Sequence, residues 1–378
     1  SVILTPTAYN TSEALCVKPS DGTGDFDFSR ATEATRINSL GLVETIGINL
    51  PRINYEGECG SWLFEPQSTN LFNYSEDLGN SYWSDFGTEV SRNLNASQIN
   101  PSGTAGSYEL EGVGGLRRFG IFLTVTPSTD YTLSFYAKNI DATLLKALFT
   151  NSSVTTYTYT SEVNTTDWSR VEINFTTLTG TSTSVQILRD LPIGESAFFW
   201  GLMLEEQSYA TSYIPSNGGQ VTRNKDLCNN GATGTGLINS TEGVLYAEIA
   251  ALANDATNRV ISISDGTASQ RISIVLGTSS NQIRGQVLSS STSFDFSTTS
   301  YNTLNNNKIA ISYKLNDFSM WINGTKVSTD TSGNTPVGMN TISFNEGAAT
   351  LDYFGKTKCI AVWKEALTDA ELTSLTTI

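Results

Sequence analysis

The chain contains no histidine. This absence removes the commonest general base of enzymes, and with it every Ser-His-Asp and Cys-His catalytic arrangement. It also removes all metal sites that depend on imidazole ligands. Among catalytic arrangements, pairs of carboxylates remain to be considered.

Charge is scarce and unbalanced in this chain. Only 16% of the residues are charged, and 22 Lys and Arg against 37 Asp and Glu give a net charge of -15. Phosphate backbones and anionic membranes would be repelled, so nucleic acid is not expected as a partner. No run of about 18 apolar residues is present, and the start SVILTPTAYN lacks the charged region and apolar core of a signal peptide, so no membrane insertion is expected.

The four cysteines are spread too widely for a zinc cluster or a CxxC redox pair to be read from them. A chain of 378 residues is expected to fold as two or three domains and needs no disulfide staples. We therefore expect four free, buried thiols, at Cys16, Cys59, Cys228 and Cys359.

The stretch from Asp25 to Tyr82 is neither helix-periodic nor a clean series of alternating strands. Its apolar residues come in short groups separated by Gly, Pro and Asn, which indicates an extended strap. Such a segment must take its order from the surfaces against which it lies. Arg30 and Arg36 bracket the run ATEAT, and a rigid guanidinium fork suits fixing the strap to carboxylates or carbonyl groups.

Three motifs of the strap stand in one order: FSRATEATRIN, GLVETIGINLPRINY and WLFEPQSTNLFNYSEDL. The series resembles a segment of bacteriophage virion proteins of the tail-fibre and head-fibre kind, in which it precedes lectin-like sandwiches. The resemblance implies a place on the surface of the phage particle and a homotrimer. Because the strap is too irregular to bury its own apolar groups, we expect it in or beside the subunit contacts. The resemblance brings no catalytic residue with it.

Short alternating runs follow between residues 69 and 226, among them YTLSFYAK (131–138), SRVEINFT (169–176) and TSVQIL (183–188). Each run ends at Gly, Asn, Asp or Pro, and their spacing predicts an antiparallel sandwich. The order of LTVTPSTDYTLSFYAK and FFWGLMLEEQSYATSYIPSNGGQVTRNKD resembles carbohydrate-binding modules of the jelly-roll type.

A second sandwich is predicted over residues 227–378, after the Gly- and Asn-rich opening CNNGATGTG. In MWINGTKV, Asn323-Gly324 favours a tight type I′ turn between two strands. Near the end, Thr368 and Glu371 predict a capping box for one short helix. The combination of MWINGTKV with the later ALTDAEL resembles the concanavalin A-like, laminin-G-like sandwich.

Pairs of acids are candidates for catalysis because glycoside hydrolysis needs only two carboxylates about 5 to 10 Å apart. Residues i and i+2 share one face of a strand, whereas i and i+1 point to opposite faces. No pair sits in a glycosidase-like motif, so we interpret them as solvated turn charge and expect neither a catalytic residue nor enzyme activity. The same carboxylates would be the ligands of Ca²⁺, but no dense Asp/Asn loop marks such a site, so no cofactor is assigned and calcium is left as the alternative. The pairs are Asp25 with Asp27, Glu56 with Glu58, and Glu205 with Glu206.

Aromatic side chains are the remaining candidates, because sugars stack their apolar faces on rings while nearby Asn, Gln and Asp bind their hydroxyls. Most rings, including Trp200 and Trp363, are expected to fill cores. Tyr157 and Tyr159 lie two apart in a Thr-rich strand and therefore share one face, which makes that face a candidate glycan platform. The candidate glycan-binding residues are Tyr157, Tyr159, Trp168 and Tyr213.

The sequence as a whole predicts an all-β protein with an N-terminal strap and attachment segment (1–68), a jelly roll like a carbohydrate-binding module (69–226), a concanavalin A-like or laminin-G-like sandwich (227–378) and one short C-terminal helix. We expect a noncatalytic fibre or appendage of a phage virion that binds a glycan on the host surface. A capsid-decorating structural adaptor that binds other virion proteins is the alternative, and a polysaccharide depolymerase is a third. A lectin-like fold does not by itself establish lectin activity.

Overall fold

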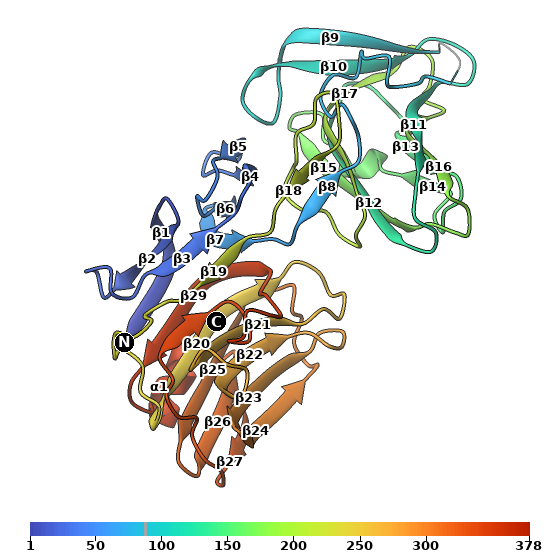
Figure 1. Cartoon of the computed structure of the whole chain (residues 1–378). Coiled ribbons are helices and arrows are strands. Elements are labelled where there is room, and N and C mark those ends of the chain that lie inside the picture. Colours follow the sequence, from blue (N-terminus) through green and yellow to red (C-terminus); the bar gives the residue numbers. More distant parts are fainter. Residues whose placement is uncertain (87–88) are drawn as a thin grey trace. The chain divides into compact units, whose positions relative to one another are not determined.

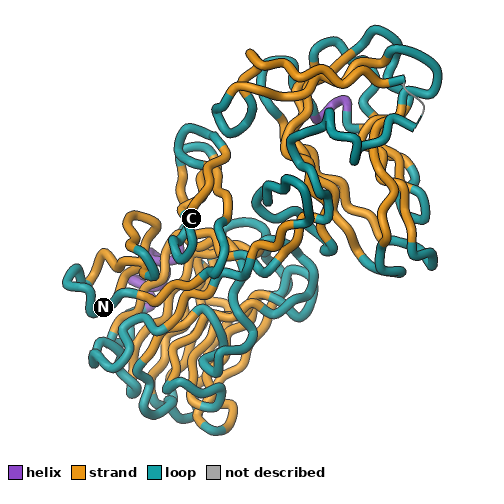
Figure 2. Tube along the Cα trace, turned by 45° about the horizontal axis from the view of Figure 1, so that its top comes forward, coloured by secondary structure: helices purple, strands orange, loops and turns teal. Residues whose placement is uncertain are grey.

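The computed structural model describes residues 1–86 and 89–378. Nearly all regular structure in these residues is strand (Figures 1 and 2), and their one α-helix is the eight-residue α1 (Asp369–Thr376). A single 3₁₀ turn spans Thr160–Glu162. The prediction of an all-β protein with one short C-terminal helix is confirmed. Within the described ranges, no helix has the length and apolar character needed to cross a membrane.

The described chain divides into two compact units. Unit 1 consists of Ser1–Gly41, Ile46–Pro66 and Asn224–Ile378, and unit 2 of Leu42–Thr45 and Gln67–Arg223. The main changes between units, at 66/67 and 223/224, lie close to the expected boundaries at 68/69 and 226/227. The strap does not form a compact unit of its own, because most of it belongs to unit 1 together with the C-terminal sandwich.

Unit 1 contains two antiparallel sheets. The larger follows the order β19-β3-β2-β1-β29-β20-β25-β26-β27, with β7 also on β29 and β6 on β7, and the smaller follows β24-β23-β22-β21-β28. The strands of the larger sheet are β1 (Val2–Asn10), β2 (Glu13–Lys18), β3 (Phe26–Ser29), β6 (Ile53–Glu56), β7 (Cys59–Phe64), β19 (Leu227–Asn229), β20 (Glu242–Ala251), β25 (Asn307–Lys314), β26 (Asp317–Ile322), β27 (Thr325–Asp330) and β29 (Gly355–Trp363). Those of the smaller sheet are β21 (Arg259–Ser264), β22 (Gln270–Leu276), β23 (Ile283–Ser289), β24 (Ser291–Thr298) and β28 (Thr341–Ser343). The strap also contains the short strands β4 (Ala34–Ile37), in unit 1, and β5 (Val43–Ile46), of which residues 43–45 belong to unit 2.

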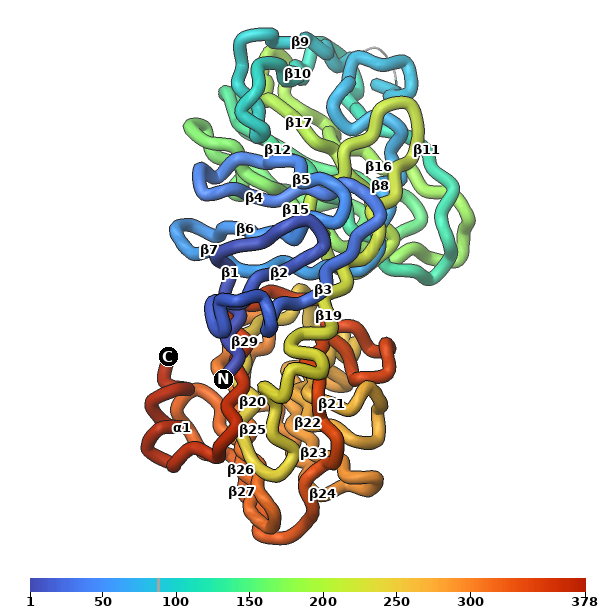
Figure 3. Tube along the Cα trace, turned by 60° about the vertical axis from the view of Figure 1, so that its left-hand side comes forward, coloured from blue at the N-terminus to red at the C-terminus, as the bar shows by residue number. Residues whose placement is uncertain are grey.

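The strap is built into the core of unit 1. Strand β1 pairs with β29 near the C-terminus, and Figure 3 shows the two side by side. Phe26, Phe28, Trp62 and Phe64 of the strap are buried in one apolar cluster with side chains from both sheets. Most apolar groups of the strap are therefore covered within the same chain, while Leu40 and Ile48 remain exposed, which weakens the structural reason for placing the strap at a subunit contact. The homotrimer stays a prediction.

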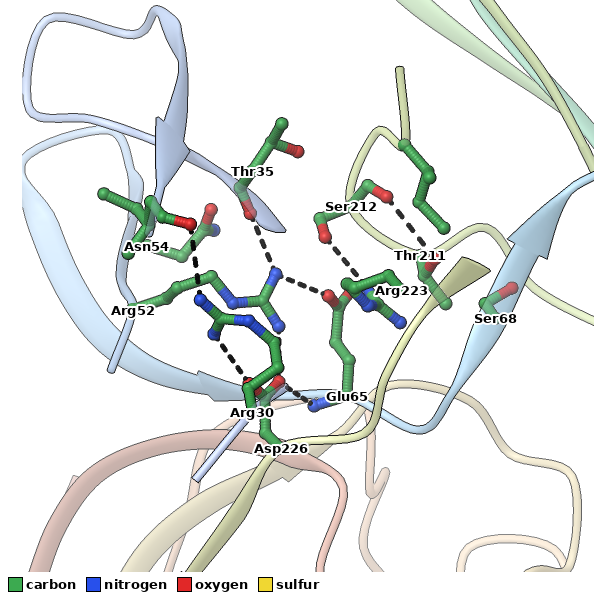
Figure 4. A network of polar contacts seen from close by, with 12 residues as sticks. Arg30, Thr35, Arg52, Asn54, Glu65, Ser68, Thr211, Ser212, Arg223 and Asp226 are labelled. Atoms are coloured by element: carbon green, nitrogen blue, oxygen red, sulfur yellow. Dashed lines mark hydrogen bonds and ion pairs between the residues drawn. The ribbon is translucent and has the colours of Figure 1, made fainter. Parts of the chain in front are cut away.

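A buried ionic network fixes the strap (Figure 4). Arg30 pairs with Asp226 at 2.9 Å and donates to three backbone carbonyls of the strap. Arg52 pairs with Glu65 at 2.7 Å and with Asp226 at 2.5 Å, and all four side chains are almost fully excluded from solvent. Arg36 likewise reaches a backbone carbonyl, at 3.4 Å. The prediction that arginines fix the strap to carboxylates and carbonyl groups is confirmed.

The end of the chain folds as its local sequence predicts. Asn323 and Gly324, between β26 and β27, both have positive φ, at 49° and 80°, which a type I′ turn requires. The side chain of Thr368 accepts from the backbone N–H of Glu371, whose carboxylate accepts in return, so the capping box is confirmed. The backbone N–H of Gly324 donates to Thr376 of the helix at 3.1 Å, which holds α1 on the turn.

Unit 2 is an antiparallel sandwich with its own core. One sheet has the order β15-β12-β17-β10-β9 and the other β11-β16-β13-β14, and side chains from both form one apolar cluster. The strands are β9 (Val90–Ile99), β10 (Ala105–Gly112), β11 (Arg118–Thr124), β12 (Asp130–Asn139), β13 (Lys146–Phe149), β14 (Thr156–Thr158), β15 (Ser169–Thr176), β16 (Ser182–Arg189) and β17 (Ser196–Glu205). A two-stranded ribbon pairs β8 (Ser68–Asn70) with β18 (Val221–Arg223), next to the two ends of the long segment that builds unit 2.

The cysteines are free, as expected, but not all of them are buried. Cys16 and Cys228 are buried and Cys359 is half-buried, and burial raises the pKa of Cys16 and of Cys359 to about 12. Cys59 is exposed, because it begins β7 directly after the tight turn at Gly57. The expectation of four buried thiols is therefore wrong for Cys59.

Candidate functional site

The two tyrosines predicted to form a glycan platform point into unit 2. Tyr159 is fully buried in the core, and its hydroxyl donates to the carbonyl of Ile187 at 2.8 Å. Tyr157 of β14 is half-buried against the same core, and its hydroxyl donates to Glu162 at 2.8 Å. The predicted exposed platform is wrong, because the face that the two rings share is the inner face of the sandwich.

The other two aromatic candidates come from different elements. Tyr213 is buried against Trp200, and its hydroxyl donates to Glu76 at 2.8 Å. Trp168 precedes β15 and is half-buried, with its indole N–H donating to the carbonyl of Ile99 at 2.8 Å. Trp200 is buried, as expected. Tyr213 is thus a packing residue, and Trp168 keeps a partly exposed ring.

Three acids of the strap pairs, Asp25, Asp27 and Glu56, bind other groups of the chain. Asp25 accepts from a backbone N–H at 2.6 Å, and Asp27 accepts from an asparagine side chain at 2.8 Å. Glu56 forms a surface ion pair with Lys356. Within residues 1–86 and 89–378, no group of three or more Cys, Asp and Glu side chains is placed to hold a metal ion. Calcium binding stays a prediction.

A polar pocket of about 400 Å³ lies beside the β8–β18 ribbon of unit 2. Two segments that are far apart in sequence build it, together with the residues that follow β17. Its lining is dominated by amide and hydroxyl side chains, with one apolar side chain and one carboxylate. The lining residues are Gln67, Ser68, Thr69, Leu71, Glu206, Gln207, Gln220 and Thr222.

Hydrogen bonds between the two segments fix the walls of the pocket. In the ribbon, Thr69 stands opposite Thr222, and their hydroxyls lie 2.8 Å apart. The amide of Gln220 donates to the carbonyl of Leu71 at 3.2 Å. Strand pairing therefore brings residues from both ends of unit 2 into one wall, and the pocket exists only when the ribbon is formed.

The floor of the pocket rests on the buried carboxylate of Glu205. It accepts from the hydroxyl of Ser68, from the amide of Gln207 at 2.8 Å and from the backbone N–H of Thr211 at 2.9 Å. Burial raises the pKa of Glu205, and the hydrogen bonds from Ser68 and Thr211 and the charge of Arg223 oppose the rise. Because Glu205 orients Ser68 and Gln207, it positions two lining groups without being exposed to the pocket.

Glu206 is the one carboxylate among the residues that line the pocket. It accepts from the hydroxyl of Tyr131 at 3.0 Å and from that of Thr126 at 3.3 Å. Glu205, the last residue of β17, and Glu206, which follows the strand, therefore bind different partners. The pocket offers hydrogen-bond donors and acceptors but no pair of acids.

Comparisons with known proteins give no family. No protein-family model matches the chain, and no curated protein matches it. Similar solved structures include a carbohydrate-binding domain (CBM40) of the Ruminococcus gnavus IT-sialidase bound to α2,3-sialyllactose, with 13% identity over 37% of this chain and 84% of that one and a TM-score of 0.33. Domain 4 of a GH43 arabinanase from Geobacillus stearothermophilus, in complex with arabinotriose, shares 15% identity over 46% of this chain and 84% of that one, with a TM-score of 0.33. Domains LG4-5 of the mouse laminin α1 chain share 9% sequence identity over 67% of this chain and 89% of that one, with a TM-score of 0.24. At these values the similarity carries no functional conclusion.

Sequence reasoning missed every residue that lines the pocket except Glu206, which it considered only as half of an acid pair. The lining groups are ordinary Ser, Thr and Gln side chains in a chain rich in them, and Ser68 is 137 residues from Glu205. The one local signal was the run LEEQSYATSYIPS, in which a carboxylate at the end of an apolar strand is followed by hydroxyl residues. That signal marks the support of the pocket and not its lining.

Proposed function

We propose that this protein is a noncatalytic glycan-binding fibre or appendage of a phage virion and that it attaches to a glycan on the host surface. The observation that carries the proposal is the lining of the pocket beside the β8–β18 ribbon. Its amides, hydroxyls and single carboxylate match the alternating donors and acceptors of a saccharide.

The size and character of the pocket suit one or two sugar units. A volume of about 400 Å³ falls within the range of small-molecule sites, roughly 300 to 1,000 Å³. Leu71 supplies an apolar contact for the C–H face of a ring. Gln67 and Gln220 are exposed at the pocket and offer both an N–H donor and a carbonyl acceptor.

The placement of the acids supports binding without cleavage. Glycoside hydrolysis needs two carboxylates on either side of the scissile bond. Glu206 has no second acid among the lining residues, and Glu205 is buried and bonded to Ser68, Gln207 and Thr211. The chain also has no histidine that would replace the missing acid.

The virion location rests on the strap. The ordered motifs FSRATEATRIN, GLVETIGINLPRINY and WLFEPQSTNLFNYSEDL resemble those of phage tail-fibre and head-fibre proteins, which also supports the homotrimer. Light scattering of the intact chain tests that oligomeric state. A monomer at micromolar concentration would contradict it.

A capsid-decorating adaptor is the second candidate, and one surface favours it. Three loops at one end of unit 2 are joined by backbone hydrogen bonds, including Gly194 to Gly112 at 2.7 Å and Asp190 to Arg117 at 3.0 Å. They expose large apolar side chains, which is typical of protein contacts. These are Val113, Leu116, Ile140 and Ile193.

A glycan array probed with the intact protein tests the proposed function. Binding to a host-surface glycan should weaken at least about tenfold in a Gln67→Ala/Gln220→Ala variant, because each amide bonds the sugar in place of water. Gln98→Ala, in β9 and outside the pocket, is the matched control and should bind as the original chain does. Loss of binding in the control alone, or release of reducing ends from the bound polysaccharide, would contradict the proposal.

A further inference from the structure

The outer face of the four-stranded sheet of unit 2 is separate from the pocket. In β11, β16 and β13, alternate residues such as Phe119, Val185 and Ala147 enter the core. The residues between them therefore point away from the core, because side chains alternate along a strand. Six of these form what we call the basic face: Arg118, Phe122, Lys146, Ser184, Gln186 and Arg189.

Every charged residue in the four strands of this sheet is basic. β11, β13, β14 and β16 contain Arg118, Lys146 and Arg189 and no Asp or Glu, although the whole chain has a net charge of -15. Arg118 and Arg189 are direct cross-strand partners. In a chain with an excess of acidic residues, a merely solvated face is not expected to carry only basic ones. This cluster of positive charge therefore favours an anionic ligand.

One carboxylate offsets part of this charge. Asp190, directly after β16, pairs with Lys146 at 3.0 Å and with Arg189 at 3.1 Å. Although partial burial opposes it, these two cations lower the pKa of Asp190, so it is ionised at neutral pH. Arg118 has no ion-pair partner in the described part of the chain, and its Nε–H is buried without a hydrogen bond there. Three cations and one anion leave two positive charges, and Arg118 is the group without a counter-ion.

A second polar group on this face also lacks a partner. Gln186, in the inner strand β16, is 4% exposed and lies beside Ser184, to whose hydroxyl its amide N–H donates at 3.1 Å. Its carbonyl oxygen accepts no hydrogen bond from any described residue. This oxygen is covered in the unbound chain, and a buried acceptor without a donor costs free energy, so a ligand hydroxyl that bonds it when the amide turns outward would satisfy it.

An exposed aromatic ring completes the face. Phe122 of β11 is the cross-strand partner of Ser184 and is 63% exposed. Its ring packs edge-on against Phe86, with centroids 5.2 Å apart, which holds it in place without covering it. Phe122 and Arg118 are four residues apart on one strand, or about 13 Å. This span suits an oligosaccharide better than a single sugar.

We propose that the basic face binds a carboxylate-bearing oligosaccharide, such as a chain of uronic acids. A carboxylate of the ligand pairs with Arg118, a sugar ring stacks on Phe122, and a hydroxyl between them donates to Gln186. Arg is suited to this role because its planar fork binds a carboxylate through two N–H groups. The site goes beyond the proposed function, because it names a second surface and a ligand class and does not depend on the pocket.

A fluorescence polarisation assay with the intact protein tests the proposal. The labelled ligands are fragments of oligogalacturonate, oligoalginate and hyaluronan, each titrated with the protein. At least one should bind, and methyl-esterified oligogalacturonate, which lacks the carboxylates, should not bind measurably. Added salt should weaken the binding of the acidic oligosaccharide, as expected for a partly exposed ion pair. Binding of none of the three, or equal binding of galacturonate and its methyl ester, would overturn the proposal.

Substitutions on the basic face test whether the acidic oligosaccharide binds there. Arg118→Gln and, separately, Phe122→Ala should each weaken binding at least about tenfold. Phe122 is exposed, so its replacement leaves the fold intact, as a circular dichroism melt would confirm. Lys364→Gln removes one positive charge from the exposed surface of unit 1 and should have no effect. Normal binding by both face variants, with loss in Gln67→Ala/Gln220→Ala, would place the acidic ligand in the pocket and overturn the assignment to the basic face.

Discussion

Arg30 and Asp226 are 196 positions apart in the sequence, yet they form a 2.9 Å ion pair from which solvent is fully excluded. Arg52 shares the same carboxylate, and both arginines belong to the strap. Removal of one partner of such a pair leaves an uncompensated buried charge, which commonly costs about 3 to 5 kcal/mol. The strap should therefore tolerate the loss of one charge of this network poorly.

Replacement of Asp226 by Asn should accordingly lower the free energy of unfolding of unit 1 by about 3 to 5 kcal/mol. Urea denaturation, followed by tryptophan fluorescence, measures it. Asp369→Asn, which breaks the exposed Lys326–Asp369 pair, is the matched control and should cost at most about 1 kcal/mol. Equal effects of the two substitutions would contradict the structural role of the network.

The buried Glu205 predicts a pH dependence. Burial raises its pKa in the folded state, so the folded protein holds this proton more tightly than the unfolded chain does. The stability that Glu205 contributes is then fully present below its unfolded pKa, near 4.5, and is lost as pH rises through the higher folded value. The stability of the original chain relative to Glu205→Gln should therefore fall as pH increases from about 4.5. Urea denaturation of both proteins from pH 4 to pH 8 measures this difference, and a constant difference would show that the pKa is not raised.

The turn at Asn323-Gly324 predicts that the stability cost of replacing a glycine by alanine depends strongly on where the glycine lies. Gly324 has φ of 80°, and an added Cβ would lie 3.1 Å from Thr377 of the C-terminal end. Gly324→Ala should destabilise the protein by about 1 to 3 kcal/mol. Gly219→Ala, where φ is not positive and no atom lies within 4 Å of the added Cβ, should change the melting temperature little. Differential scanning calorimetry compares the two, and the opposite ranking would show that the turn is not as described.

Thiol reactivity should separate the cysteines. Cys59 is exposed, whereas burial raises the pKa of Cys16 to about 12, which leaves almost no reactive thiolate at neutral pH. Ellman titration of the native protein should show one fast-reacting thiol, and the denatured protein should show four. Cys59→Ser should remove the fast phase. A fast phase that survives this substitution would mean that another cysteine is accessible.

Local chemistry explains what the sequence could predict. Arg30 was assigned to carboxylates and carbonyls, and Asn323-Gly324 to a type I′ turn, because each inference needs only the residue and its immediate neighbours. The run YTLSFYAK likewise predicted a strand of an antiparallel sandwich, which is β12. Such local inferences fail when the answer depends on which face of a strand is covered by the rest of the fold. Tyr157 and Tyr159 do share a face, but the pattern could not tell that it is the inner one.

The pocket could not be predicted from the sequence for a related reason. Thr69 and Thr222 meet only because β8 pairs with β18, and Gln207 turns towards Ser68 only because Glu205 is buried beneath them. No periodicity in the sequence reports a pairing over such a separation. The basic face was hidden in the same way, since Arg118, Lys146 and Arg189 look unrelated until the sheet order is known.

The ribbon of β8 and β18 has a consequence for how such a chain can diversify. Ser68 and Arg223 are direct strand partners, so the long segment between them leaves and returns at neighbouring points. A few residues further out, the backbone N–H of Asp226 donates to the carbonyl of Glu65 at 3.0 Å, which joins the two segments of unit 1 on either side of the insertion. A different module whose two chain ends lie side by side could be spliced between these points by recombination. New specificities would then be acquired by exchange of a whole domain, while the strap and the C-terminal sandwich keep their sequence.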